Sequence, residues 1–262
     1  MRILFITSSS INGGAQKHIR EMFKSLLGLG HDMYIAAPNG WLLDELRDYK
    51  DRTFPLDSLK SGVRCISDVM ENVKPDITNT FILSGGILGT LAWRKKKYGK
   101  LFVTVNNPVI YDGISTIGKL FYPHMYRWMS KYVSAFLVKS DKVRDEVNNI
   151  IKDSKPVLSI KNGIDFTIFN KDAAYADLKS ELGICKSDIV ITNVAVLNER
   201  KGQQHLIEAV NILRKRYSIH LMLAGEGPSL QSLVRLTEQL RVQSYVHFLG
   251  RRSDINRVLA NT

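Results

Sequence analysis

The chain has 262 residues, of which 44% are hydrophobic and 24% charged, an ordinary globular composition that excludes a disordered chain and is sufficient for two domains. No apolar run reaches the ~18 residues that a transmembrane helix needs, so we expect a soluble protein. Cys65 and Cys185 lie far apart without a CxxC or Cys/His cluster, so we expect reduced thiols in a cytoplasmic protein. The formal net charge of +12 favours acidic partners, namely nucleic acid, anionic lipid or a phosphorylated substrate.

The first part of the chain alternates predicted strands and helices, the pattern of a parallel α/β domain. Apolar runs predict strands at 2–7, 33–37, 77–83, 101–105, 135–138 and 157–160. Helical periodicity predicts helices from Ala15, around 66–73, at 85–97, at 119–131 and after Ser140, which is a candidate N-cap. The loop after the first strand contains Gly13-Gly14, where the backbone can approach a ligand closely.

The second part predicts a further strand–turn–helix–strand unit. Residues 189–197 form a β-rich apolar run, the helix after it carries apolar residues at helical spacing, and further strands are predicted at 219–224 and 245–249. Parallel α/β folds bind ligands where their strands end, beside helix N-termini. The turn Arg200-Lys201-Gly202 places two cations and a glycine at such a point, which suits a phosphate.

Several motifs together resemble retaining glycosyltransferase family 4, the glycosyl transferases group 1. They are Lys201-Gly202 followed by Leu206-Ile207-Glu208-Ala209, then Gly225-x-Gly227-Pro228 and Val246-x-Phe248-Leu249-Gly250, and, upstream, Asn162-Gly163-Ile164-Asp165 with Phe169. Each is weak alone, but their order and spacing are specific. The resemblance implies a GT-B α/β fold with two Rossmann-like domains facing across a cleft, an acceptor-side domain at 1–168 and the first part of a nucleotide-sugar-binding domain at 169–262.

The resemblance also implies the chemistry. A sugar would pass from a nucleoside diphosphate sugar to an acceptor hydroxyl with retention, in polysaccharide, lipopolysaccharide or glycolipid assembly. The binding residues would be Gly13, Gly14, Arg200, Lys201, Gly202, Gly225 and Gly227, with Lys201 and Asn106 as the catalytic residues. No Asp-x-Asp occurs, so we expect neither a metal nor a cofactor besides the donor.

The sequence departs from the family pattern at three positions. Phe81 and Asn106 occupy places where histidines often occur, and Val196 occupies the place of an arginine. The Glu-x7-Glu motif that would hold the donor's sugar and ribose is absent. These departures leave open an inactive or accessory relative, or one chain of a split enzyme, that acts as a membrane-surface or polyanion-binding module. We also expect the chain expressed alone to aggregate, to have a less stable second domain and to transfer no sugar.

A basic, aromatic region suggests a membrane surface. Residues 94–97 and Lys100 form a cationic cluster, and the helix at 119–131 includes Tyr126 and Trp128. Family members that act on lipid-linked acceptors use such a face on anionic membranes, so association with the inner face of the membrane is one interpretation. Solvated helix ends beside a core-facing aromatic stripe are the alternative. Nucleic acid is disfavoured because no recognised binding motif accompanies the charge.

Overall fold

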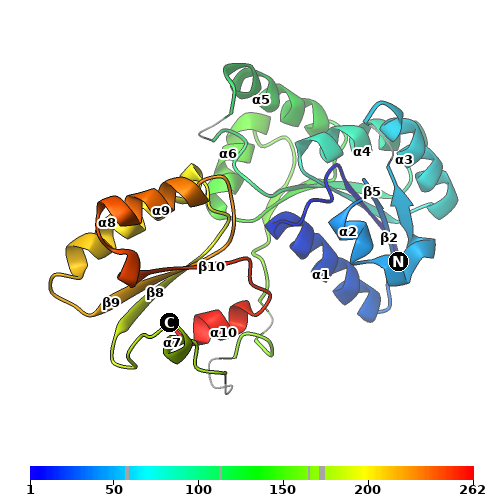
Figure 1. Cartoon of the computed structure of the whole chain (residues 1–262). Coiled ribbons are helices and arrows are strands. Elements are labelled where there is room, and N and C mark those ends of the chain that lie inside the picture. The colour runs from blue at the N-terminus through cyan, green and yellow to red at the C-terminus, as the bar shows by residue number, and fades with distance from the viewer. Residues whose placement is uncertain (57–58, 112–113, 165, 171–174) are drawn as a thin grey trace. The chain divides into compact units, whose positions relative to one another are not determined.

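The chain folds into two compact units, Met1–Gly163 and Ile164–Thr262 (Figure 1). The computed structural model describes residues 1–56, 59–111, 114–164, 166–170 and 175–262. Asp165 of the predicted Asn-Gly-Ile-Asp turn therefore lies outside the described residues. The second unit begins at Ile164, five residues before Phe169, where we predicted the start of the second domain.

The first unit contains a seven-stranded parallel sheet of order β3-β2-β1-β4-β5-β6-β7. The strands are β1 (Arg2–Thr7), β2 (Asp32–Ala37), β3 (Thr53–Pro55), β4 (Ile77–Phe81), β5 (Lys100–Val105), β6 (Ala135–Val138) and β7 (Val157–Ser159). The strands follow the chain outward in opposite directions from β1 and β4, which pair with each other in parallel. Such a switch point is where open α/β sheets bind ligands, beyond the carboxyl ends of the strands.

Helices cover both faces of this sheet. They are α1 (Gly14–Gly28), α2 (Trp41–Asp44), α3 (Leu59–Val73), α4 (Leu83–Lys96), α5 (Thr116–Ser130) and α6 (Asp141–Ile151), with a 3₁₀ segment η1 (Arg47–Arg52). On α1, Ile19 and Phe23 are completely buried against β1 and β2, which is the i, i+4 pattern read from the sequence. The predicted N-cap Ser140 is confirmed, since its Oγ accepts a hydrogen bond from the amide of Val143 at 3.4 Å.

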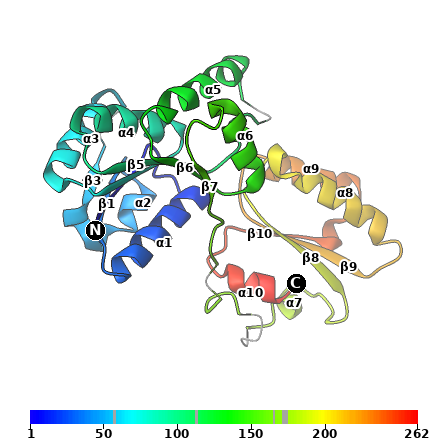
Figure 2. The ribbon, with the colours of Figure 1, turned by 180° about the vertical axis from the view of Figure 1, so that it is seen from behind.

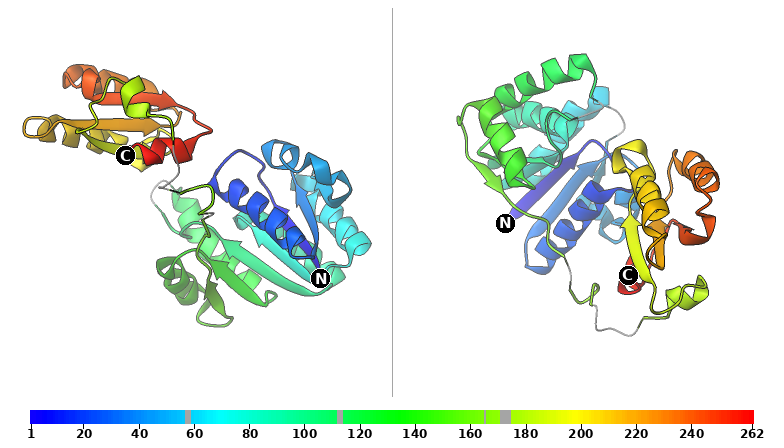
Figure 3. Two further views of the ribbon diagram at one scale, coloured as in Figure 1. Left: turned by 90° about the horizontal axis from the view of Figure 1, so that it is seen from below. Right: turned by 90° about the vertical axis from the view of Figure 1, so that its left-hand side faces the viewer.

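The second unit has a three-stranded parallel sheet of order β10-β9-β8. Its elements are α7 (Leu178–Glu181), β8 (Ile189–Val194), η2 (Glu199–Lys201), α8 (Gln203–Leu213), β9 (Ile219–Ala224), α9 (Leu230–Gln239), η3 (Gln243–Tyr245), β10 (Val246–Gly250) and α10 (Ile255–Ala260). Helices α8 and α9 pack on one face of the sheet, and α7 and α10 on the other, as Figures 2 and 3 show from further directions. Both units are therefore Rossmann-like α/β layers, which confirms the predicted fold of each domain.

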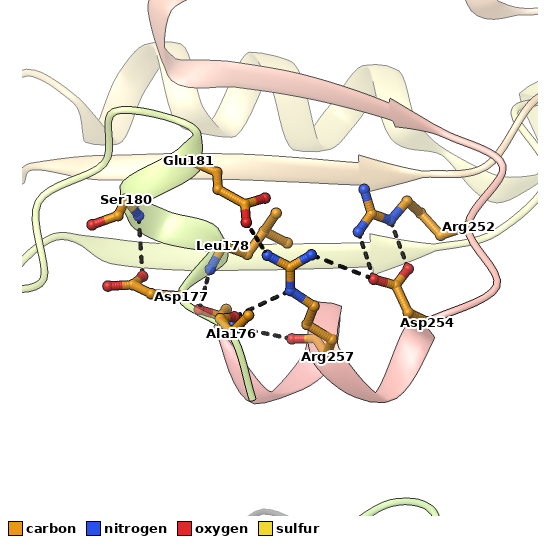
Figure 4. Close-up of polar contacts among 9 residues, drawn as sticks. Ala176, Asp177, Leu178, Ser180, Glu181, Arg252, Asp254 and Arg257 are labelled. Carbon is orange, nitrogen blue, oxygen red and sulfur yellow. Dashed lines mark hydrogen bonds and ion pairs between the residues drawn. The ribbon is translucent and has the colours of Figure 1, made fainter. Parts of the chain in front are cut away.

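The short helix α7 is joined to α10 by side-chain contacts (Figure 4). The Arg257 guanidinium forms an ion pair with Glu181 and donates from Nε to the carbonyl of Ala176 at 3.1 Å. Asn261 accepts from the amide of Leu178 at 2.9 Å. The segment that enters the second unit is thus fixed to α10, and both cover the buried Val190 and Met222.

The sequence predictions differ from the structure mainly at strand ends. The apolar run 189–197 was expected to be one strand, but β8 ends at Val194, and the amides of Ala195 and Leu197 beyond it still donate to the carbonyls of Ala224 and Glu226. The strand predicted at 77–83 ends at Phe81, and Ile82, with φ of 66°, turns the chain into α4. The short elements α2 and β3 were not predicted. No helix among the described residues is long and apolar enough to cross a membrane.

Candidate functional site

In the second unit, the loops after β8 and β9 are bonded to each other. The amide of Ala195 donates to the carbonyl of Ala224, the last residue of β9, at 3.1 Å, and the amide of Leu197 donates to the carbonyl of Glu226 in the following loop at 2.9 Å. The amide of Ser229 donates to the carbonyl of Leu197 at 3.1 Å. We call residues 195–197 and 225–227 the loop junction. Its contacts fix both loops at the carboxyl edge of the sheet, where the predicted donor-binding residues lie.

Gly225 and Gly227 allow these two loops to meet. A Cβ on Gly225 would lie 1.9 Å from the carbonyl oxygen of Ala195, and Gly225 has a φ of +154°. A Cβ on Gly227 would lie 2.2 Å from the carbonyl oxygen of Leu197. The structure therefore gives both glycines a packing role that is sufficient to explain them, whether or not they also contact a donor.

The predicted phosphate turn leads directly into α8. Arg200 and Lys201 are exposed in η2, and Gly202 adopts a left-handed conformation, with φ of 67°, as the N-cap of α8. Gly202 has no side chain to occupy the first-turn amides of this eleven-residue helix. An uncapped helix N-terminus carries partial positive charge, which the Lys201 ammonium reinforces.

Gln203, which we did not predict from the sequence, holds this turn in place, and Asn198 has a buried polar atom beside it. Gln203 is 1% exposed, and its Nε2 donates to Oδ1 of Asn193 at 3.2 Å and to the carbonyl of Val196 at 3.1 Å. Oδ1 of Asn198 is buried without a hydrogen-bond partner among the described residues. A polar residue at the first position of a predicted helix, after a glycine, was the signal that could have identified Gln203.

In the first unit, a cavity of about 540 Å³ opens at the carboxyl ends of β4 and β5. Its lining comes from the start of α1, the loops after β4 and β5, and α5. Asn106 belongs to this lining, and its Nδ2 is buried with no hydrogen-bond partner among the described residues. Ala15 and Gln16 also line the cavity, directly after Gly13 and Gly14.

The glycine pair itself begins α1. Gly13 is the N-cap, with an extended backbone and no side-chain cap. A Cβ on Gly14 would meet nothing within 4 Å, so packing does not explain why this residue is glycine. Our interpretation from the sequence, that glycine at position 14 lets a ligand approach the backbone closely, therefore stays a prediction.

Hydrogen bonds fix the walls of the cavity. At its base, Oγ1 of Thr104 donates to Oδ1 of Asn79 at 2.9 Å. The carboxylate of Glu146 accepts from the amides of Val109 and Ile110 at 3.0 and 2.8 Å. Burial, and secondarily the charge of Glu146, raises the pKa of Tyr126 well above its ordinary value, so this wall residue stays a neutral phenol.

Four residues singled out in the sequence are buried or paired. Phe81 is completely buried, with its ring centroid 5.1 Å from that of Phe5, and so contributes to the core. Tyr126 is 5% exposed, which for this residue agrees with the alternative of a core-facing aromatic stripe. In the cationic cluster, Lys96 pairs with Glu71 at 2.6 Å, and the Arg94 guanidinium lies 4.6 Å from the ring centroid of Tyr132.

The predicted site residues thus fall into two groups. Arg200, Lys201 and Gly202 lie at the start of α8 beside the loop junction of the second unit. Gly13, Gly14 and Asn106 lie at the carboxyl edge of the first unit, at or next to the cavity. Lys201 and Asn106, the two residues predicted to be catalytic, belong to different units.

Two family models match the chain. Residues 12–168 match the model described as Glycosyltransferase Family 4, and residues 175–262 match that of Glycosyl transferases group 1. EpsD of Bacillus subtilis (strain 168), a glycosyltransferase by name, is 25% identical over 90% of this chain and 65% of its own length. The alpha-monoglucosyldiacylglycerol synthase of Streptococcus pneumoniae is 24% identical over 77% of this chain and 47% of its own length. The chain thus spans less than two thirds of these relatives.

Solved structures show the same fold. HepE of Anabaena, solved in complex with UDP, superimposes with a TM-score of 0.83 at 18% identity, covering 100% of this chain and 72% of HepE. Sucrose-phosphate synthase of Thermosynechococcus elongatus gives a TM-score of 0.76 at 14% identity, with coverage of 100% and 72%. At these identities the likeness establishes the architecture alone.

Proposed function

Since the chain belongs to glycosyltransferase family 4, we propose that it acts in transferring a sugar from a nucleoside diphosphate sugar to an acceptor hydroxyl. The second unit would bind the donor and the first unit the acceptor. Retention of the anomeric configuration, independence of metals and a role in polysaccharide, lipopolysaccharide or glycolipid assembly are parts of the proposal that rest on the family resemblance.

The observation that carries the proposal is the start of α8. An exposed Lys201 directly precedes a glycine N-cap that leaves the first-turn amides of α8 without a side-chain cap. Oxygen atoms of a diphosphate are the ligands that such a combination favours. The buried Gln203 next to this turn donates to the carbonyl of Val196 in the loop junction, and donors that are already positioned cost less reorganisation when charge develops on a ligand.

The proposed chemistry follows from charge. When the bond between the anomeric carbon and the diphosphate oxygen breaks, the electron pair leaves with the nucleoside diphosphate. A positioned cation and a helix N-terminus stabilise that growing negative charge, and removing one such group typically costs about 10²–10³ in rate. The side chain of Val196 is 56% exposed and supplies no charge at the place where the family pattern has an arginine, so Lys201 would carry a larger share.

Calorimetry with UDP tests this directly. We expect Lys201→Ala to weaken UDP binding about tenfold or more, since a charge-assisted hydrogen bond contributes roughly 1.5–3 kcal/mol. Lys215→Ala, which also removes an exposed charge, just beyond the other end of α8, should leave binding unchanged. Equal losses in both variants would indicate non-specific charge attraction and would contradict the proposed site.

We further propose that the acceptor is presented at an anionic membrane surface. The start of α5 carries exposed apolar side chains, with Ile117 80%, Leu120 73% and Phe121 49% exposed, next to the exposed Lys119. Apolar side chains beside a cation are typical of an interfacial helix. The cluster at 94–97 lies at the end of α4, at the opposite edge of the sheet, so we assign the contact to α5.

Vesicle co-sedimentation tests this second proposal. Leu120→Ser should weaken binding to anionic vesicles about tenfold, since burying one leucine side chain contributes roughly 1.5–3 kcal/mol. The control Leu29→Ser removes a leucine that is also 73% exposed, at the end of α1. If the wild-type protein does not bind the vesicles, or if both variants lose binding equally, the proposed membrane contact of α5 is contradicted. The chain would then act without membrane contact, as a transferase or as an accessory chain.

A further inference from the structure

Two cation-forming side chains meet in the first unit, outside the cavity lining. Lys139 directly follows β6, and its Nζ lies 2.6 Å from Nε2 of His18 on α1. Both side chains are half-buried. Among the residues that the structure describes, neither forms an ion pair with a carboxylate. This pair is therefore unlike the exposed lysines that produce most of the net charge.

The arrangement is costly without a further partner. Burial lowers the pKa of Lys139, and burial together with the charge of Lys139 lowers the pKa of His18. The short contact requires that His18 be neutral and accept from the ammonium, because two charged groups at this distance repel each other. An anion placed against the pair would stabilise the charged forms of both side chains.

The pair lies at the same edge of the sheet as Asn106. Val105 and Val138 are register partners on β5 and β6, so the residues that follow them, Asn106 and Lys139, leave the sheet side by side. Nδ2 of Asn106 is buried and has no partner among the described residues. A buried amide N–H without a partner favours a ligand that accepts hydrogen bonds.

We propose that Lys139, His18 and Asn106 form a binding site for an oxyanion, a phosphate or a carboxylate group carried by the acceptor. All three side chains present nitrogen donors once His18 is protonated, and oxyanions have only acceptor atoms. The assignment of the anion to the acceptor rests on the proposed function. Oxyanion binding itself does not, because it requires no donor nucleotide.

Calorimetry with inorganic phosphate, and separately with malonate as a carboxylate probe, tests the site on the whole chain. Lys139→Met should weaken binding of the preferred anion about tenfold or more, and NMR signals of the His18 ring should shift when that anion is added. Lys142→Met removes an exposed lysine from the nearby α6 and should bind like the wild type. Circular dichroism confirms that the variants are folded.

The outcomes separate the alternatives. Phosphate binding without malonate binding assigns a phosphorylated acceptor, and the reverse assigns a carboxylate. Equal weakening by Lys139→Met and Lys142→Met, or no shift of the His18 ring by either anion, would overturn the proposal. Because UDP binding by the second unit is measured with Lys201 variants, failure of this site and failure of the proposed donor site are distinguishable.

Discussion

Replacing Gly225 by alanine should destabilise the second unit through one identifiable contact. The added Cβ would lie 1.9 Å from the carbonyl oxygen of Ala195, and the residue would keep a φ of +154°. A backbone conformation of this kind costs a non-glycine residue roughly 1–3 kcal/mol, and overpacking costs roughly 1–3 kcal/mol more. We therefore expect a loss of about 3 kcal/mol or more, a large part of the stability of a small domain.

Gly183→Ala is the matched control. Gly183 also has a positive φ, +68°, but a Cβ there would meet nothing within 4 Å. The substitution then carries only the conformational cost of roughly 1–2 kcal/mol. The difference between the two variants measures the contact with Ala195 at the loop junction, separately from the cost of the backbone conformation.

Urea unfolding followed by two probes locates the effect. The three tryptophans, Trp41, Trp93 and Trp128, all lie in the first unit. Tryptophan fluorescence therefore reports the first unit, and far-UV circular dichroism reports both. Gly225→Ala should move part of the circular dichroism transition to lower urea and leave the fluorescence transition in place. Equal destabilisation by Gly225→Ala and Gly183→Ala would refute the reasoning, since the contact would then contribute nothing.

Two other predictions concern stability. Gln203→Ala should lower the free energy of unfolding in a urea titration by about 1–3 kcal/mol, because the carbonyl of Val196 and Oδ1 of Asn193 lose their donor. Gln204→Ala at the exposed neighbouring position should have little effect in the same titration. Similar values for both variants would contradict the anchoring role of Gln203. Burial lowers the pKa of His18 and His247, so below about pH 6.5 the unfolded chain binds more protons than the folded one, and stability should fall as the pH drops through that value. Thermal unfolding between about pH 7.5 and 5.5 should show this fall, and replacing both histidines by glutamine should reduce it; an unchanged pH dependence in the double variant would exclude these residues as its cause.

Most of the fold could be predicted from the sequence because apolar periodicity and glycine positions follow from local rules. The helix at Gly14–Gly28 and the strands β1 and β6 agree with their predicted ranges. The end of β8 at Val194 could not be predicted, because the apolar run continues to Leu197 and no local signal marks Val194 as the last residue of the strand.

The candidate site was predictable in part for the same reason. The turn at Arg200–Gly202 lies before a helix, as expected, because its spacing is local. The packing role of Gly225 was not predictable, since the atom that excludes a side chain belongs to Ala195 on another loop. The contact of His18 with Lys139 joins residues 121 positions apart, and no spacing rule indicates it.

The most direct test of the account is a site-resolved NMR titration of the chain with UDP. The account predicts that the largest amide shifts fall on Lys201, Gly202 and the first turn of α8, and that they are lost in Lys201→Ala. Shifts confined to other basic surfaces, such as residues 94–97, or no saturable shift at all, would contradict donor binding at the start of α8.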